Sequence, residues 1–176
     1  MASSGPRRSG GRSASAKASS RLWTRWSSRS EADRVAAMRV AAPFSVTVSR
    51  VRAALGERGF GVLTEIDVRA TLRQKLGVQM EEYLILGACN PALAHRALDT
   101  DRDIGLLLPC NVVVRADGPD TTLVQALEPR VMVQISGQPR PRDVADEATT
   151  RLHAALDTLA ERPPPAATDA PTAEAH

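Results

Sequence analysis

A tight turn in the second half of the chain constrains the fold more than any other feature. Asp117 and Gly118 separate two apolar runs, residues 110–115 and 121–127. Such a short connection joins antiparallel strands, whereas two parallel strands need a crossover of a dozen or more residues. The turn therefore predicts a β-hairpin, and it argues against a purely parallel, doubly wound sheet.

Helix and strand periods alternate before this hairpin, and a last helix follows it. The predicted elements are strands at 38–44, 60–66, 82–88, 104–115 (interrupted by Pro109) and 121–127, and helices at 45–57, 68–76, 91–98 and 142–160. Ser45, Asp67 and Asn90 can each cap a helix start, and residues 131–135 fit either a strand or a helix. The order β-α-β-α-β-α-β-β-α favours a single α+β domain, with helices packed on one face of a mixed or antiparallel sheet.

The two ends of the chain differ in composition from the part between them. Residues 1–37 are rich in Ser, Gly, Ala and Arg, and residues 162–176 are rich in Pro, Ala and Thr. Neither segment can bury enough apolar surface to offset the entropy of ordering, so both are predicted to be disordered tails. The folded domain is expected at residues 38–161, and Met38 is a candidate for the true start of the protein.

Positive charge is concentrated in the first tail. Residues 1–30 hold seven basic and no acidic residues, which leaves sixteen basic residues (23 minus 7) and twenty acidic residues for the remainder. The remainder is therefore acidic, and it offers few aromatic rings on which nucleic-acid bases can stack. No specific nucleic-acid partner is expected, and the tail adds at most salt-sensitive contacts to nucleic acid or anionic lipid.

Three further classes of protein are disfavoured by what the sequence lacks. No apolar run approaches the roughly 20 residues that span a bilayer, and the N-terminus has no apolar stretch of the kind found in secretory signals. Two cysteines are too few for a disulfide framework. We therefore expect a cytoplasmic protein with reduced thiols. An organelle transit peptide is the lesser alternative, because the N-terminus is rich in Arg and Ser.

Three blocks of sequence resemble one known family. They are GFGVLTEIDVRATLRQKLG at residues 59–77, YLILGACNPALAHRAL at 83–98 and IGLLLPCNVVVR at 104–115. Their order and spacing are similar to those of the family catalogued as domain of unknown function 302, over roughly residues 38–160. The resemblance implies a compact α+β domain grouped with TATA-binding-protein-like folds, with a curved sheet backed by helices. It implies neither DNA binding nor an established activity, and it assigns no functional residues.

Two Cys-Asn pairs stand where apolar strands are predicted to end or bend, and they form the main candidate site. Cys89 and Asn90 precede Pro91, which fits the first position of a helix, and Cys110 and Asn111 form the second pair. A helix start can lower the pKa of a thiol. Cys89 is therefore a candidate nucleophile, redox thiol or soft-metal ligand, with Cys110 as a second metal ligand. The simpler alternative is that both thiols are packing groups and that Asn90 only caps the helix.

Three other residues complete the candidate site. His95 lies on the helix after Cys89, where it can assist that thiol; alternatively it is an exposed residue beside Asp99. Glu65 and Asp67 are two positions apart at a strand end, so they can share one side and hold a proton or a cation. The alternative is that Asp67 caps the next helix while Glu65 is solvated.

Three functions fit these residues, in order of preference. The first is a module that binds a small ligand or a soft metal ion at the Cys-Asn pairs. The second is an interaction domain that forms a homodimer through an open sheet face or edge. The third is a thiol-dependent enzyme that uses Cys89, with His95 as its helper. The sequence does not identify a cofactor, so none is assigned.

Overall fold

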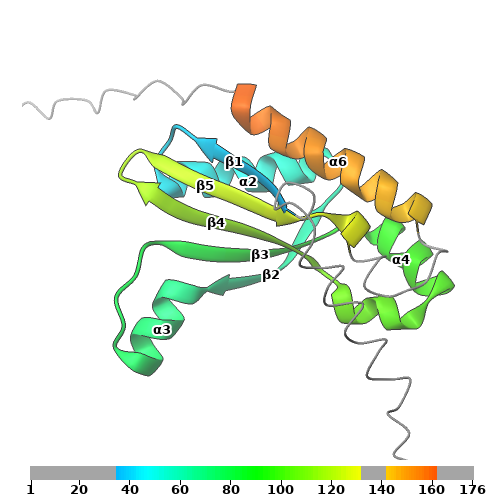
Figure 1. Ribbon diagram of the computed structural model, residues 1–176, viewed down its shortest axis with the longest axis horizontal. Coiled ribbons are helices and arrows are strands. Elements are labelled where there is room, and N and C mark those ends of the chain that lie inside the picture. Colours follow the sequence, from blue (N-terminus) through cyan, green and yellow to red (C-terminus); the bar gives the residue numbers. More distant parts are fainter. Residues whose placement is uncertain (1–34, 132–141, 162–176) are drawn as a thin grey trace, which may run out of the picture. The chain divides into compact units, whose positions relative to one another are not determined.

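The computed structural model of this chain describes residues 35–131 and 142–161, which form an α+β domain (Figure 1). Its elements in chain order are β1 (Val35–Val40), α2 (Phe44–Glu57), β2 (Gly61–Asp67), α3 (Val68–Leu76), β3 (Tyr83–Cys89), α4 (Pro91–Thr100), η2 (Arg102–Leu107), β4 (Cys110–Gly118), β5 (Thr121–Leu127) and α6 (Arg142–Glu161). The η2 segment is a 3-10 helix. The α+β class and the predicted order of strands and helices are confirmed, with η2 as an addition.

The five strands form one open sheet in the order β1-β5-β4-β3-β2. Every neighbouring pair is antiparallel, so the predicted sheet is antiparallel throughout its described strands. The predicted hairpin is confirmed, since β4 pairs with β5 and Val114 lies opposite Val124. Its turn lies at Pro119 and Asp120, whereas Asp117 and Gly118, where the turn was predicted, are the last residues of β4. The hairpin includes the central strand, β4, and the two edge strands are β1 and β2.

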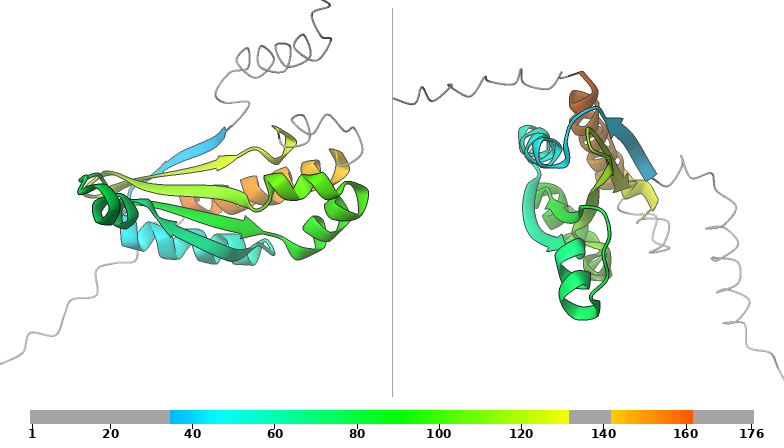
Figure 2. Two further views of the ribbon diagram at one scale, coloured as in Figure 1. Left: turned by 90° about the horizontal axis from the view of Figure 1, so that it is seen from below. Right: turned by 90° about the vertical axis from the view of Figure 1, so that its left-hand side faces the viewer.

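One face of the sheet packs against α2 and α6, and the hydrophobic core lies between them (Figure 2). Alternate residues of the inner strands point toward these helices, because side chains alternate between the two faces of a strand. The largest fully enclosed apolar side chains of this core are those of Val51, Leu55, Leu86, Val112, Val114, Val124 and Leu152. Helices α3 and α4 lie at opposite ends of the sheet (Figure 1).

The first two elements differ from the prediction. The first strand covers Val35–Val40, so it begins ahead of Met38. Helix α2 begins at Phe44, and Pro43 occupies the N-cap position without a side-chain hydrogen bond. The predicted cap at Ser45 is therefore wrong, and this residue lies inside the helix. The hydroxyl was a poor guide here because the ring of Pro43 already fixes the backbone of the residue that precedes the helix.

The predicted long strand across residues 104–115 is wrong in its first half. This part forms η2, and β4 begins only at Cys110. The carboxylate of Asp101 accepts a hydrogen bond from the backbone N–H of Asp103 at 2.9 Å, which starts the helical turn. A short apolar run looks the same in a buried helix and in a strand, which explains the error. Pro109, which follows a cis peptide bond, precedes the first residue of β4.

Two predicted helix caps are confirmed. The carboxylate of Asp67 accepts a hydrogen bond from the N–H of Ala70 at 2.8 Å, at the start of α3. The side-chain oxygen of Asn90 accepts one from the N–H of Leu93 at 3.2 Å, at the start of α4. Both side chains satisfy N–H groups that a helix start leaves without an intrahelical partner.

Some predictions concern residues outside the described ranges. They are the first tail up to residue 34, the tail at 162–176, and positions 132–135 of the segment predicted to be either strand or helix. The first residue of that segment, Val131, is described and lies in a short helical turn. In the part of the chain that the structure describes, no helix combines the length and the apolar character needed to span a membrane.

Candidate functional site

A partly open cavity lies at the end of the sheet where β3 leads into α4. Its volume is about 60 Å³, and β3, β4, α4, η2 and α6 all contribute to its lining. The lining is almost wholly apolar and includes Phe60, Cys89, Asn90, Leu93, Cys110 and Ala148. The cysteines of both predicted Cys-Asn pairs therefore face one cavity.

Asn90 turns the chain from β3 into α4 and so builds one wall of the cavity. Its backbone is extended, with φ −96° and ψ 112°, while its side chain caps the helix. Pro91 takes the first helical position, where its missing N–H leaves no hydrogen bond unmade. Leu93 and Ala97 then fall on one side of α4, four positions apart, and pack in a cluster with Val144 of α6.

The two thiols are buried in this cavity. Each cysteine is 9% exposed, and the register of β3 and β4 places Ala88, the neighbour of Cys89, opposite Cys110. Burial raises the pKa of the Cys89 thiol. Burial, and to a smaller extent the nearby charge of an ionised Cys89, raises the pKa of Cys110 to about 11. The prediction that the helix start lowers the pKa of Cys89 is therefore wrong, because desolvation disfavours the thiolate more strongly.

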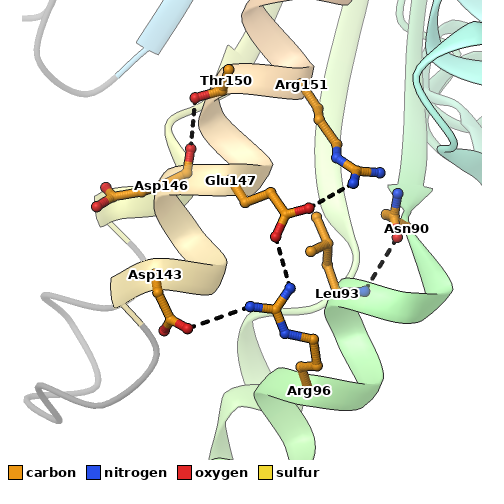
Figure 3. Close-up of polar contacts among 8 residues, drawn as sticks. All are labelled: Asn90, Leu93, Arg96, Asp143, Asp146, Glu147, Thr150 and Arg151. Carbon is orange, nitrogen blue, oxygen red and sulfur yellow. Dashed lines mark hydrogen bonds and ion pairs between the residues drawn. The ribbon is translucent and has the colours of Figure 1, made fainter.

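An ion-pair network joins α4 to α6 beside the cavity (Figure 3). Arg96 reaches two carboxylates of α6, with Nη1 2.7 Å from Glu147 Oε2 and Nη2 3.4 Å from Asp143 Oδ2. Glu147 also accepts a hydrogen bond from Arg151 Nη2 at 2.6 Å. Hydrogen bonds from Arg96 and Arg151 hold the pKa of Glu147 below its usual range. Because water screens exposed ion pairs, the network links the two helices but contributes little to the free energy of unfolding.

Gly59 leaves room for two side chains next to the cavity. Its φ of 80° lies in the left-handed region that favours glycine. A Cβ at this position would lie 2.9 Å from Nδ2 of Asn90 and 3.7 Å from Nη1 of Arg151. This role of Gly59 depends on segments far apart in the chain, which no local pattern reveals.

Three other predicted site residues lie near the cavity in sequence but do not line it. Pro91 is exposed at the start of α4. The side chain of His95 is 78% exposed, and its Nδ1 lies 3.2 Å from Oδ2 of Asp99. Asn111 is exposed, and strand alternation places it on the face of the sheet opposite Cys110. His95 is therefore not positioned to assist Cys89 in this conformation.

Glu65 and Asp67 lie toward the other end of β3. Asp67 pairs in register with Leu84, whereas the cavity is formed beside the last residues of β3. Glu65 forms an ion pair with Arg52 of α2, and Asp67 caps α3. The two carboxylates thus have separate partners, and neither reaches the thiols.

Metal-binding side chains do not gather in large clusters. Across residues 35–131 and 142–161, no group of three or more His, Cys, Asp or Glu side chains is placed to hold a metal ion. A soft metal ion in the cavity would therefore rely on Cys89 and Cys110 as its protein ligands.

The apolar part of the lining was not predicted as a site. Leu93, Ala97, Val144 and Ala148 occupy helical positions that face inward. Their spacing predicts burial, and it is the same whether the core is filled or leaves a gap. The signal for the cavity is therefore absent from the local sequence.

The fold and the cavity define a small α+β domain with an open antiparallel sheet and two buried thiols at one end. The model of the family described as Domain of unknown function DUF302 matches residues 36–159, so the chain belongs to this family. It is also similar to the crystal structure of the uncharacterized conserved protein DUF302 from Bacillus stearothermophilus. The identity is 30%, the TM-score is 0.66, and the match covers 71% of this chain and 97% of that chain. No curated protein matches the chain. The family resemblance noted in the sequence is confirmed.

Proposed function

We propose that this domain binds the apolar end of a small molecule in the cavity between β3, β4, α4 and α6. The observation that carries the proposal is a partly open cavity with an almost wholly apolar lining. Ligand sites are typically concave and apolar, with a few polar groups that fix orientation. Here the side-chain oxygen of Asn90 caps α4, and the thiols of Cys89 and Cys110 are the other polar groups of the lining.

The volume of the cavity limits the class of ligand. An apolar cavity of about 150 Å³ in another protein holds benzene, and this cavity has about 60 Å³. It therefore encloses only a few carbon atoms, and the rest of the ligand must extend through the opening. A short alkyl or acyl chain with a polar end in water fits this description.

A series of straight-chain alcohols tests this proposal on the full-length chain. Each methylene that enters the cavity should increase the affinity about fourfold, because burial of one CH₂ contributes about 0.8 kcal/mol. The increase should stop when the cavity is full. Titrations followed by amide chemical shifts would measure the affinities and report which residues respond.

Two alanines of α4 offer a matched pair of variants for this experiment. Ala94 lines the cavity, whereas Ala92 is exposed on the same helix. Ala94→Leu should fill the cavity and abolish binding, and Ala92→Leu should bind as the wild type does. Equal binding by both variants, or an affinity that does not depend on chain length, would refute the proposal.

A soft monovalent metal ion such as Cu(I) is the second candidate ligand. It is supported by the two thiols that share the cavity, since thiolates select such ions. Binding must release the thiol protons, so the affinity should rise with pH. Native mass spectrometry with Cu(I) under reducing conditions, on the wild type and on Cys89→Ser/Cys110→Ser, tests it; equal metal content in both would exclude the site. The metal site needs reduced thiols, and we therefore propose a cytoplasmic location.

A further inference from the structure

Exposed apolar side chains are concentrated in one short segment. Among the described residues, the large hydrophobic side chains with high exposure are Leu63 (64%), Ile66 (50%), Leu76 (70%), Val78 (45%) and, in η2, Leu106 (88%). Four of these five lie within residues 63–78, which comprise most of β2, all of α3 and the two residues after it. Exposed apolar surface that is concentrated in one part of a protein marks interaction sites. We call residues 63–78 the arm.

Helix α3 has an apolar side that the described domain leaves largely uncovered. Val68, Leu72 and Leu76 recur every four positions and so lie along one side of the helix. No residue of α3 is buried, although Val68 and Leu72 are partly covered. The helix lies at the end of the sheet, away from α2 and α6 (Figure 1). A helix of nine residues depends on packing for its stability, so a surface that covers this side would stabilise it.

The apolar surface of the arm continues onto the sheet. Ile66 lies opposite Ile85, which in turn lies opposite Val113. These residues alternate with core residues such as Leu86, so they face away from α2 and α6. Because neighbouring strands are about 4.8 Å apart, the row extends the apolar surface about 10 Å beyond β2.

The free edge of β2 is poorly suited to pairing with another strand. The register shifts between Val62 and Thr64, which makes Leu63 a bulge, and Glu65 and Asp67 add charges to the same strand. Bulges and charges are common protections of edge strands. A partner is therefore expected to pack on the side chains of the arm instead of extending the sheet.

Charges of both signs surround the apolar side of α3. Arg69 lies 3.8 Å from Glu82, whereas Arg73, Lys75 and Glu81 form no ion pair with another described residue. A two-fold axis that packs the apolar sides of two α3 helices together can also bring Arg73 of one copy beside Glu81 of the other. An acidic protein or an anionic lipid surface would instead meet Glu81 and Glu82 as like charges. The charge pattern therefore favours a second copy of the same chain.

We propose that the arm forms a two-fold interface with a second copy of this chain. In this interface the apolar sides of the two α3 helices pack against each other, and Arg73 of each protomer faces Glu81 of its partner. Helix α3 lies at the opposite end of the sheet from α4 (Figure 1), so the contact between the two α3 helices is separate from the cavity.

The first test compares two leucines by sedimentation velocity of the full-length chain. Leu76 lies in the arm and Leu106 lies outside it, and both are highly exposed. The wild type and Leu106→Glu should be dimers, and Leu76→Glu should be a monomer. The dissociation constant of the Leu76→Glu dimer should be at least about 30-fold higher than that of the wild type, as for substitution of an interface hot spot. A monomeric wild type would overturn the proposal. So would loss of the dimer in both variants or in neither. Leu76-dependent binding of a monomeric wild type to phosphatidylserine vesicles would assign the arm to a membrane instead.

The second test exchanges charges and does not depend on a possible folding defect of one variant. Arg73→Glu and Glu81→Arg should each be monomeric alone, because each places like charges opposite one another. An equimolar mixture of the two should form a heterodimer, since opposite charges then meet at both contacts. Failure of the mixture to associate, while each variant has a wild-type circular dichroism spectrum, would refute the proposed pairing.

Discussion

Thiol reactivity provides a quantitative test of the cavity. The thiolate is the nucleophile in alkylation, so the rate depends on the ionised fraction. Cys110 has a pKa of about 11, so about one thiol in 3,000 is ionised near pH 7.5, against about one in ten for an ordinary cysteine. We therefore expect Cys110 to react with iodoacetamide about 300-fold more slowly than a model thiol, before limited access slows it further.

Intact mass measured over time would give this rate for each cysteine. The Cys89→Ser variant isolates Cys110, and the Cys110→Ser variant isolates Cys89. Burial is the main cause of the raised pKa of Cys110, so most of the effect should persist without Cys89. The same variants unfolded in urea provide the control and should react at the rate of a model thiol. If folded Cys110 reacted within about tenfold of the unfolded control, the burial argument would fail. Rapid labelling of folded Cys89 would instead support the thiol-dependent enzyme.

Three further predictions concern stability. The pKa of Cys110 is higher in the folded protein than in the unfolded chain. The contribution of its neutral thiol to the free energy of unfolding is therefore present below about pH 8.5 and is lost as the pH rises through about 11. Urea unfolding at pH 8 and pH 10.5 should therefore show the wild type losing about 2 kcal/mol relative to Cys110→Ala; a constant difference would contradict this. Gly87→Ala should cost about 1–3 kcal/mol in the same assay, because the added Cβ overlaps Thr64 Oγ1; Thr64→Ala should recover part of the loss, and an unchanged midpoint for Gly87→Ala would count against the packing. Deletion of residues 1–31 should leave the melting temperature unchanged, whereas deletion of residues 1–37 removes half of β1 and should lower it by several degrees. Equal melting temperatures would show that this half of β1 does not contribute.

Local chemistry determined most of the element order. The β4–β5 turn and the caps Asp67 and Asn90 act within a few residues of themselves, so the sequence reveals them. The turn itself lies two positions after the predicted one, at Pro119 and Asp120. The error at the start of α2 arose because Pro43, and not Ser45, occupies the N-cap position. The ring of Pro43 restricts its backbone without any side-chain hydrogen bond. The error before β4 arose because an apolar run does not show whether it is buried in a helix or in a strand.

The candidate site could be predicted only in part. The two cysteines were recognised at strand ends, and the antiparallel register of β3 and β4 brings them to one cavity. That register links strands separated by α4 and η2, so their proximity is a tertiary property. The opposite wall comes from α6, and its apolar spacing predicts burial without predicting a gap. His95 and Asn111 were close in sequence to the cysteines but face away from the cavity, since proximity along the chain does not determine direction.

The helix dipole lowers the pKa of a thiol beside a helix start, and burial raises it. The relative size of these two effects determines which of the candidate functions the site can perform. The dipole of a helix contributes about 0.3–1 kcal/mol to an exposed group, which is less than one pKa unit. Burial in apolar surroundings can shift a pKa by several units in the other direction. Asn90 already satisfies the N–H of Leu93, and Cys89 faces the cavity. An apolar ligand would remove the remaining water and disfavour the thiolate further, whereas a soft metal ion requires both thiolates. The two proposed ligands should therefore compete, and an alkyl chain that fills the cavity should weaken Cu(I) binding.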